Sequence, residues 1–354
     1  MGEADDRGEP SRRRVGLKEV AREAGVSVKT VSNVVNGYVH VTPETRSRVE
    51  RAIRELNYRP NLSARTLRQG RTGIIALAVP ELDIPYFAEL AKLIVTAAEA
   101  RSWTVLIDQT EGRREREQLV TEGIRAHLID GLIFSPLAMS AAELRDRTDD
   151  TPLVLLGERI HHGPADHVVV DNIAAAMDAT RHLIELGRRR IAAIGAQDDA
   201  AGETGRLRLA GYRRALAAAG LPFDESLVIS VDAYHRADGA RAMAHLLGSG
   251  DPPDAVFCFN DLLALGALRT LLDRGVDVPG TVALAGFDDI EDGRYSTPTL
   301  TTITPDKEMI AQHALDLLAE RMARRPARPA REVTVGHTLT RRESTLGRRR
   351  AQRD

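Results

Sequence analysis

The chain of 354 residues is 43% hydrophobic, which is enough apolar material for a small head and a body of one or two α/β lobes. Its net charge is only −2, but residues 12–71 hold 14 Lys and Arg against 5 Asp and Glu, whereas the remainder holds 35 against 46. The only cysteine, Cys258, excludes a disulfide framework and a thiolate zinc site, and it indicates a reducing compartment.

The N-terminal stretch is charged, and no later stretch is a long apolar run. Residues 1–14 lack the apolar core of a signal peptide, and no segment approaches 18 uninterrupted apolar residues, so we expect a cytoplasmic protein with no membrane segment. Residues 1–15 are predicted to be disordered. A basic module on an acidic body is typical of a protein that binds a polyanion at one end.

Two short helical patterns follow, separated by Gly25. Each has one apolar face, formed by Val20, Ala21, Ala24, Val31, Val34 and Val35. Gly25 can supply the positive φ of a tight turn, and Ser27 is suited to cap the second helix. This pattern predicts a helix-turn-helix in which Val28, Lys29 and Asn33 point outward and read base edges.

A third helix is predicted after Asn36-Gly37. Thr42 followed by Pro43 is a strong helix start, and Val49, Ile53 and Leu56 repeat on one face. Residues 16–60 are therefore predicted to form the DNA-binding domain. Asn61 to Gln69 form a short helical pattern stopped by Gly70, and about two turns of helix are marginal in water. We predict a hinge helix and linker over residues 61–72 that folds only when something packs on it.

From Gly73 the pattern alternates between apolar strands and amphipathic helices, which predicts parallel sheets covered by helices. The predicted strands are Ile74–Val79, Thr104–Ile107, Gly131–Phe134, Pro152–Leu156, Val168–Val170, Arg190–Ile194, Leu227–Val231, Ala255–Cys258, Val282–Ala285 and Glu332–Val335. The predicted helices are Tyr86–Ala100, Glu111–Ala126, Ile173–Leu186, Gly205–Ala219, Ala237–Leu247, Leu262–Leu272 and Lys307–Arg324. Two doubly wound lobes account for this order, with a chain that crosses between them more than once.

Several motifs in this order resemble those of the lactose/galactose repressor (LacI/GalR) family of bacterial transcription regulators, over about Val15 to Arg342. In the head they are Leu17 to Asn36, Val41-Thr-Pro-Glu-Thr-Arg46 and Leu56-Asn-Tyr-Arg-Pro-Asn61. In the body they are Pro85-Tyr-Phe-Ala-Glu89, Val170-Asp-Asn172, Arg208-Leu-Ala-Gly-Tyr212, Phe259-Asn-Asp261 and Gly286-Phe-Asp-Asp289. The resemblance implies a homodimer that represses transcription from a near-palindromic double-stranded DNA operator.

The resemblance also implies the fold: an all-α helix-turn-helix head and an α/β periplasmic-binding-protein-like body of two doubly wound parallel-sheet lobes. Residues 73–346 would form the body, which binds the effector and dimerises, and residues 347–354 a disordered tail. The residues implied to contact DNA are Lys18, Val28, Lys29, Thr30, Ser32, Asn33, Asn36, Asn61, Ala64, Arg65 and Leu67. Leu67 takes the position of a leucine wedged between the central base pairs. Lys29 reads guanine or touches phosphate, and these two roles stay open.

A small effector is implied in the cleft between the lobes. By motif position its contacts are Tyr86, Phe87, Glu158, Thr204, Arg208, Tyr234, Asn260 and Asp288. An arginine, an amide and a carboxylate can bind ring hydroxyls while aromatic faces cover sugar C–H groups, so a mono- or oligosaccharide is expected. Alternatives stay open: Arg208 and Asp288 as a buried structural pair, the aromatic residues as core, and Glu158 as a loop ion-pair partner.

Two other classes of protein compete with this interpretation. Asp108, Asp171, Asp288 and Asp289 could suggest an enzyme with catalytic carboxylates, but sequence separation supports no general-acid arrangement, and we predict no enzyme activity. A transport binding protein has no use for the basic head. The adjacent histidines 161 and 162 point in different directions without a third ligand, so no metal is expected. The turn at Gly202 lacks the lysine of a phosphate loop, so no nucleotide cofactor is expected.

Overall fold

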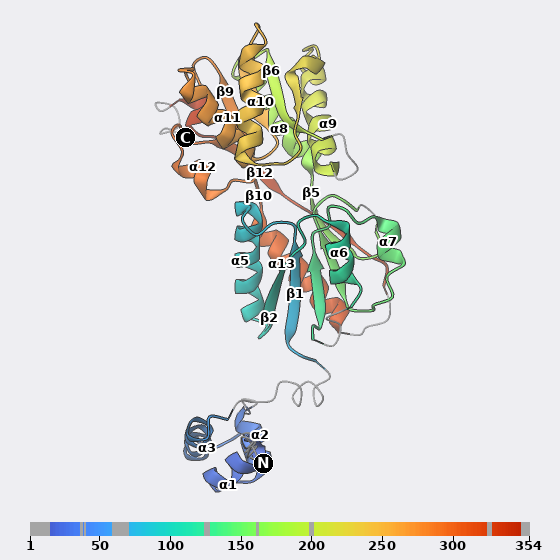
Figure 1. Ribbon diagram of the computed structural model, residues 1–354, viewed down its shortest axis with the longest axis vertical. Coiled ribbons are helices and arrows are strands. Elements are labelled where there is room, and N and C mark those ends of the chain that lie inside the picture. Colours follow the sequence, from blue (N-terminus) through green and yellow to red (C-terminus); the bar gives the residue numbers. More distant parts are fainter. Residues whose placement is uncertain are drawn as a thin grey trace, which may run out of the picture. The chain divides into compact units, whose positions relative to one another are not determined.

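The computed structural model describes residues 15–35, 38, 40–58, 71–123, 128–160, 163–197, 202–323 and 328–347. The chain divides into two compact units, residues 1–72 and 73–354, which we describe separately as the head and the body (Figure 1). No helix in these described ranges is long and apolar enough to cross a membrane.

The head contains the helices α1 (Leu17–Ala24), α2 (Val28–Val35) and α3 (Pro43–Glu55). Gly25 has φ +63°, which gives the tight turn between α1 and α2 that the sequence predicts. The hydroxyl oxygen of Ser27 accepts the backbone N–H of Thr30 at 3.0 Å, and that of Thr42 accepts the N–H of Thr45 at 3.3 Å. Both predicted N-caps are therefore confirmed.

A small apolar core holds the three head helices together. Val20, Val31 and Val49, one from each helix, have no exposed surface and pack together with the buried Ala52 and Tyr58. Because each helix is short, this shared core rather than intrinsic propensity stabilises the head.

The first lobe of the body is a six-stranded, fully parallel sheet of order β11-β5-β4-β3-β1-β2. Its strands are β1 (Ile74–Val79), β2 (Thr104–Gln109), β3 (Gly131–Phe134), β4 (Leu153–Leu156), β5 (Asp166–Val170) and β11 (Glu332–Val335). Its helices are α5 (Pro85–Glu99), α6 (Arg114–Thr121), α7 (Ala141–Arg145) and α13 (Lys307–Met322). Ile75 and Leu77 pack in the core that includes α5 and α13, whereas Ala76 and Ala78 face the opposite core, so helices cover both faces.

The second lobe is a six-stranded sheet of order β12-β10-β9-β8-β6-β7. Its strands are β6 (Ile191–Ala196), β7 (Val228–Ser230), β8 (Ala255–Cys258), β9 (Ala283–Phe287), β10 (Thr301–Pro305) and β12 (His337–Thr340). Its helices are α8 (Asn172–Glu185), α9 (Glu203–Ala218), the 3₁₀ turn η1 (Glu225–Leu227), α10 (Arg236–Gly248), α11 (Asp261–Asp273), α12 (Glu291–Tyr295) and α14 (Glu343–Leu346). Alternate residues of the central strands pack in two separate cores, so this lobe is also doubly wound.

Three connections join the lobes: β5 to α8, β10 to α13, and β11 to β12. The last is a single residue, Gly336, so the chain leaves the edge of one sheet and enters the edge of the other at once. The repeated crossing that the sequence predicts is therefore confirmed. The two predicted parallel-sheet lobes are confirmed, and one edge strand of the second lobe, β12, runs antiparallel to β10.

Some predicted boundaries also need correction. The helix expected over Glu111–Ala126 begins only at Arg114, since Glu111 and Gly112 both have positive φ and form a turn. It ends at Thr121. β10 and β12 were not predicted, because their threonine-rich sequences TTITP and HTLT lack the apolar run by which the other central strands are recognised.

Candidate functional site

The body contains a cavity of about 300 Å³ lined by both lobes. Its walls are the segments that follow the carboxyl ends of β1, β3, β4, β6, β8, β9 and β10. Ligands of open parallel sheets bind at these ends, and the volume lies at the lower end of the range for small-molecule sites. The fold therefore brings the two sheets' ligand-binding edges to one space.

All the residues that the family resemblance assigns to the effector line this one cavity. They are Tyr86, Phe87 and Glu158 from the first lobe and Thr204, Arg208, Tyr234, Asn260 and Asp288 from the second. These positions span 202 residues of sequence, so the fold and not local sequence gathers them. Their contact with a ligand stays a prediction.

Arg208, on α9, is held rigidly. Its Nε donates to Asn172 Oδ1 at 2.7 Å, one Nη donates to the backbone oxygen of Phe259, and its guanidinium carbon lies 3.4 Å from the ring centroid of Phe287. The side chain is 7% exposed. Arg208 is therefore a preorganised donor at the cavity wall, oriented by Asn172, which sequence reasoning quoted within a motif but did not assign to the site.

Asp288 follows β9 and is buried with φ +110°, a strained conformation for an aspartate. Burial raises the pKa of its carboxyl group to about 7, although the positive charges of Arg208 and Lys307 oppose this rise. The Arg208 Nη2 atom lies 4.0 Å from Asp288 Oδ1. The two residues are thus close, as the structural-pair alternative requires, but they do not form a short bidentate pair.

The aromatic residues divide into two arrangements. Tyr86 and Phe87 form an edge-to-face pair with ring centroids 5.3 Å apart, and burial with the nearby charges of Glu158 and Asp288 raises the pKa of Tyr86, so its hydroxyl stays protonated. The hydroxyl of Tyr234 donates to the backbone oxygen of Gly195 at 2.7 Å. Tyr234 therefore offers the cavity its ring rather than a free hydroxyl.

Asn260 has a structural role that sequence reasoning did not foresee. Its Oδ1 accepts the backbone N–H of Leu263 at 2.8 Å, which caps α11, and its Nδ2 donates to the backbone oxygen of Tyr234 at 3.0 Å. The amide thus ties the loop before α10 to the start of α11. It stands at the cavity wall with both ends of the amide already engaged.

Two side-chain hydrogen bonds join residues of the first lobe to residues of the second at the cavity. Thr204 Oγ1 donates to Glu158 Oε2 at 3.2 Å, and the His235 Nε2 and Glu81 Oε2 atoms lie 3.0 Å apart. Glu81 and His235 were not predicted, because no motif marks them and 154 positions separate them. Each bond joins one lobe to the other, so both depend on the relative position of the lobes.

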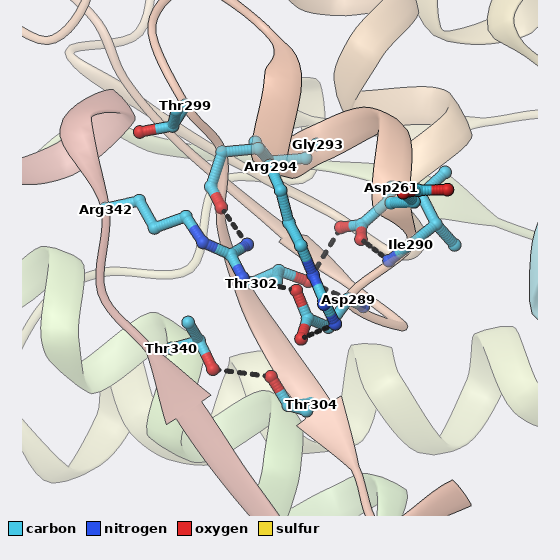
Figure 2. Close-up of polar contacts among 12 residues, drawn as sticks. Asp261, Asp289, Ile290, Gly293, Arg294, Thr299, Thr302, Thr304, Thr340 and Arg342 are labelled. Carbon is cyan, nitrogen blue, oxygen red and sulfur yellow. Dashed lines mark hydrogen bonds and ion pairs between the residues drawn. The ribbon is translucent and has the colours of Figure 1, made fainter.

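A polar network surrounds Asp289 and Ile290, which follow Asp288 in the loop after β9 (Figure 2). Asp289 Oδ2 accepts Arg294 Nη2 at 2.9 Å, and Arg342 near the C-terminal end binds the other oxygen at 2.5 Å. Asp261 accepts the hydroxyl of Thr302 at 2.7 Å and the backbone N–H of Ile290 at 3.0 Å. These contacts hold the loop that carries Asp288 and assign Asp289 to structure rather than to the cavity.

The head places its predicted DNA-contacting residues differently from one another. Lys18, Val28 and Lys29 are exposed, and Thr30 and Asn33 are half-buried, so the beginning of α2 offers an accessible face. Ser32 is only 5% exposed and lies among the buried residues of the head. The structure thus favours the first turn of α2 over Ser32 as a contact surface.

Several predicted positions lie outside the described residues: Asn36, Asn61, Ala64, Arg65 and Leu67, with residues 61–70 of the predicted hinge. The terminal segments 1–14 and 348–354 and the histidine pair 161–162 also lie outside them. All these assignments stay predictions.

Comparison with known proteins agrees with both units. The family model of bacterial regulatory proteins of the lacI family matches residues 16–61, and that of the periplasmic binding protein-like domain matches residues 180–345. The transcriptional regulator CelR of Thermobifida fusca is 36% identical over 343 residues, which cover 93% of this chain and 98% of CelR. The regulator DegA of Bacillus subtilis is 34% identical over 302 residues, which cover 84% of this chain and 88% of DegA.

Solved structures give the same result. The Lac repressor dimer bound to operator and the anti-inducer ONPF has a TM-score of 0.81 at 26% identity, covering 94% of this chain and 100% of that one. A CelR–cellobiose complex has a TM-score of 0.69 at 33% identity with the same coverage. The helix-turn-helix head, the two-lobed body and these identities over nearly the whole chain show that this protein belongs to the LacI family of bacterial transcription regulators.

Proposed function

We propose that this protein is a sequence-specific transcriptional repressor whose operator affinity is controlled by a saccharide bound between the lobes of the body. The cavity carries the proposal, because the assigned contacts from both lobes line one space of about 300 Å³. They include the guanidinium of Arg208, the carboxylates of Glu158 and Asp288, and the rings of Tyr86, Phe87 and Tyr234. The relatives support it, since CelR was solved with cellobiose and the Lac repressor with operator DNA. Repression of chromosomal genes places the protein in the cytoplasm.

The proposed mechanism couples the cavity to the hinge. A ligand that contacts Glu158 and Thr204 or competes for their hydrogen bond changes the relative position of the lobes. In a dimer, this position would set whether the two hinge segments, residues 61–72, can lie together and fold on DNA. A coupling free energy of about 1 to 3 kcal/mol would change operator affinity about five- to 150-fold.

We assign residues 16–60 to DNA binding, 61–72 to the hinge and 73–346 to effector binding and dimerisation. The fold divides at the same place, between residues 72 and 73. The proposal requires no cofactor or catalysis, and the relatives that match are regulators.

A mobility-shift experiment tests the function. The full-length protein would first select an operator from random duplex DNA, and its binding to that operator would then be measured with and without mono- and oligosaccharides. A ligand that weakens binding is an inducer and one that strengthens it is a corepressor. Failure to retain any DNA, or turnover of the sugar, contradicts the proposal.

Two variants separate the two sites in that experiment. Leu67→Ala should weaken operator binding and leave ligand affinity nearly unchanged, because the proposed effector contacts all belong to the body. Arg208→Met should abolish the response to ligand while the protein still binds the operator. A normal ligand response from the Arg208 variant would show that the effector site is elsewhere.

A further inference from the structure

The carboxylate of Asp288 lines the cavity and accepts no hydrogen bond from the described residues. The residue is 8% exposed. The Arg208 Nη2 atom, 4.0 Å away, is too distant, and the same guanidinium already donates to Asn172 and to the backbone of Phe259. A buried carboxylate without a donor is costly, so this site calls for a ligand that donates hydrogen bonds.

A second carboxylate acts on the same space from the other lobe. Glu158 accepts one hydrogen bond, from Thr204, and also lines the cavity. Burial raises the pKa of Asp288, and the negative charge of Glu158 adds to that rise. Burial and then Glu158 likewise raise the pKa of Tyr86. The two carboxylates are therefore within electrostatic reach of each other and of the Tyr86 hydroxyl.

The remaining lining adds negative rather than positive charge. The cavity is lined by six carboxylate side chains and two guanidinium groups. Three of the carboxylates have partners: Glu81 pairs with His235, Glu111 with Arg116 and Glu203 with Arg206. The other three are Asp232, Glu158 and Asp288, and the charges of the last two both act on the Tyr86 hydroxyl. An anionic ligand would lose its hydration and meet the negative charge of Glu158, and that of Asp288 once Asp288 has lost its proton. Hydroxyl and ammonium groups would instead meet acceptors.

We propose that this cavity selects saccharides that carry no anionic group, whose hydroxyl groups donate to Asp288 and Glu158, and that it rejects phosphorylated sugars and uronic acids. This inference rests on the proposed function and narrows the class of its ligand. Aromatic and aliphatic side chains, among them Phe87 and Leu90, supply the apolar wall that a sugar ring covers.

Matched pairs of probes test the charge selection on the full-length protein. Glucose would be compared with glucose 6-phosphate and glucuronate, galactose with galacturonate, ribose with ribose 5-phosphate, and cellobiose with cellobionate. Glucosamine is the cationic member of the panel, and binding is measured by thermal shift and calorimetry. We expect binding only among the uncharged and cationic members. An anionic member that binds as tightly as its uncharged parent overturns the inference and leaves the saccharide function intact. A panel in which no member of either charge binds contradicts the saccharide function itself.

Substitution of the two carboxylates identifies the cause of the selection. Asp288→Asn should lower the affinity for the saccharide that binds by about ten- to hundredfold, which is the effect of losing one hydrogen bond to a charged group. Glu158→Gln should improve binding of the anionic partner relative to its parent. Glu225→Gln, the same change at an exposed position outside the cavity, serves as the control. Folding is checked by the melting curve, and unchanged discrimination in both cavity variants would contradict the assignment.

Discussion

The ammonium group of Lys307, the first residue of α13, donates a hydrogen bond to the carboxylate of Glu89 on α5. It also donates to two backbone oxygens beside the cavity, that of Asp288 at 2.9 Å and that of Asp289 at 3.2 Å. The other oxygen of Glu89 accepts the backbone N–H of Glu291 at 3.2 Å. The pair therefore joins the helices of the first lobe to the loop of the second that carries the cavity carboxylate.

Replacing this lysine should destabilise the body. Lys307→Met keeps the aliphatic stem but leaves Glu89 and two carbonyl groups without their donor, which we expect to cost about 1–3 kcal/mol. Urea unfolding measures the loss. Lys92→Met, an exposed lysine on α5, is the matched control and should unfold like the wild type. Equal midpoints for both variants would show that the bridge contributes no stability.

The raised pKa of Asp288 predicts a pH dependence of stability. Its pKa is about 7 in the folded protein because of burial, against 3.8 ordinarily, with Arg208 and Lys307 opposing the rise and Glu158 and Glu89 adding to it. The folded state therefore holds one more proton than the unfolded state between about pH 4 and pH 7. Stability should fall across this window as pH rises, by about 1.4 kcal/mol per pH unit, and level off above it.

The Asp288→Asn variant separates this contribution from that of groups which do not interact with Asp288, because those groups titrate equally in both proteins. The difference in unfolding free energy, wild type minus variant, should decrease from about pH 4 to pH 7 and then stay constant. A difference that is flat over this range would contradict the raised pKa.

The accessible face of α2 predicts different roles for Asn33 and Lys29 on DNA. Asn33→Ala should remove base contacts, weaken binding to the selected operator by about 1–3 kcal/mol and relax its consensus. Lys29→Ala distinguishes the two roles left open, since a lost phosphate contact weakens all sequences alike and lowers the salt dependence by about one ion. Arg51→Ala, on the exposed side of α3, is the control. An unchanged consensus after Asn33→Ala would contradict base reading by this residue.

The edge strand β2 is the expected site of dimer contact. Ile107 is 43% exposed and its neighbour Leu106 is 37% exposed, whereas the central strands of the same sheet are buried. Ile107→Asp should raise the dimer dissociation constant about hundredfold or more, since it would bury an unpaired charge. Sedimentation measures the effect. Leu272→Asp, at a similarly exposed leucine on α11, should remain dimeric. A dimer that is unchanged in the Ile107 variant would locate the interface elsewhere.

Sequence periodicity predicts the elements whose buried side chains are apolar. Ala255–Cys258 and Glu332–Val335 have the predicted boundaries, because each is a short apolar or alternating run between turns. β10 escaped prediction because its buried Thr301 and Thr302 satisfy their hydroxyl groups through Thr345 and Asp261, which lie far away in sequence. Polar burial of this kind leaves no local signal.

The cavity shows the same limit. Motif order could assign Arg208 and Asp288 to one site, but not the tertiary partners that decide their chemistry. Asn172 orients Arg208 and Lys307 holds the backbone at Asp288, and both relations cross many residues of sequence. The pairing of Glu81 with His235 depends on how the lobes meet, which no local pattern encodes.

The last two connections between the lobes, β10 to α13 and β11 to β12, lie late in the sequence, and this affects how the body folds during synthesis. Residues 73–170 provide five strands of the first lobe, but the face later covered by α13, with Ile133 and Val154 among its residues, stays open until residues 307–335 have been made. Neither lobe is a continuous segment, so a body shortened before α13 would expose a large apolar face and aggregate. Effector binding and DNA control thus become available together, only after almost the entire chain has left the ribosome.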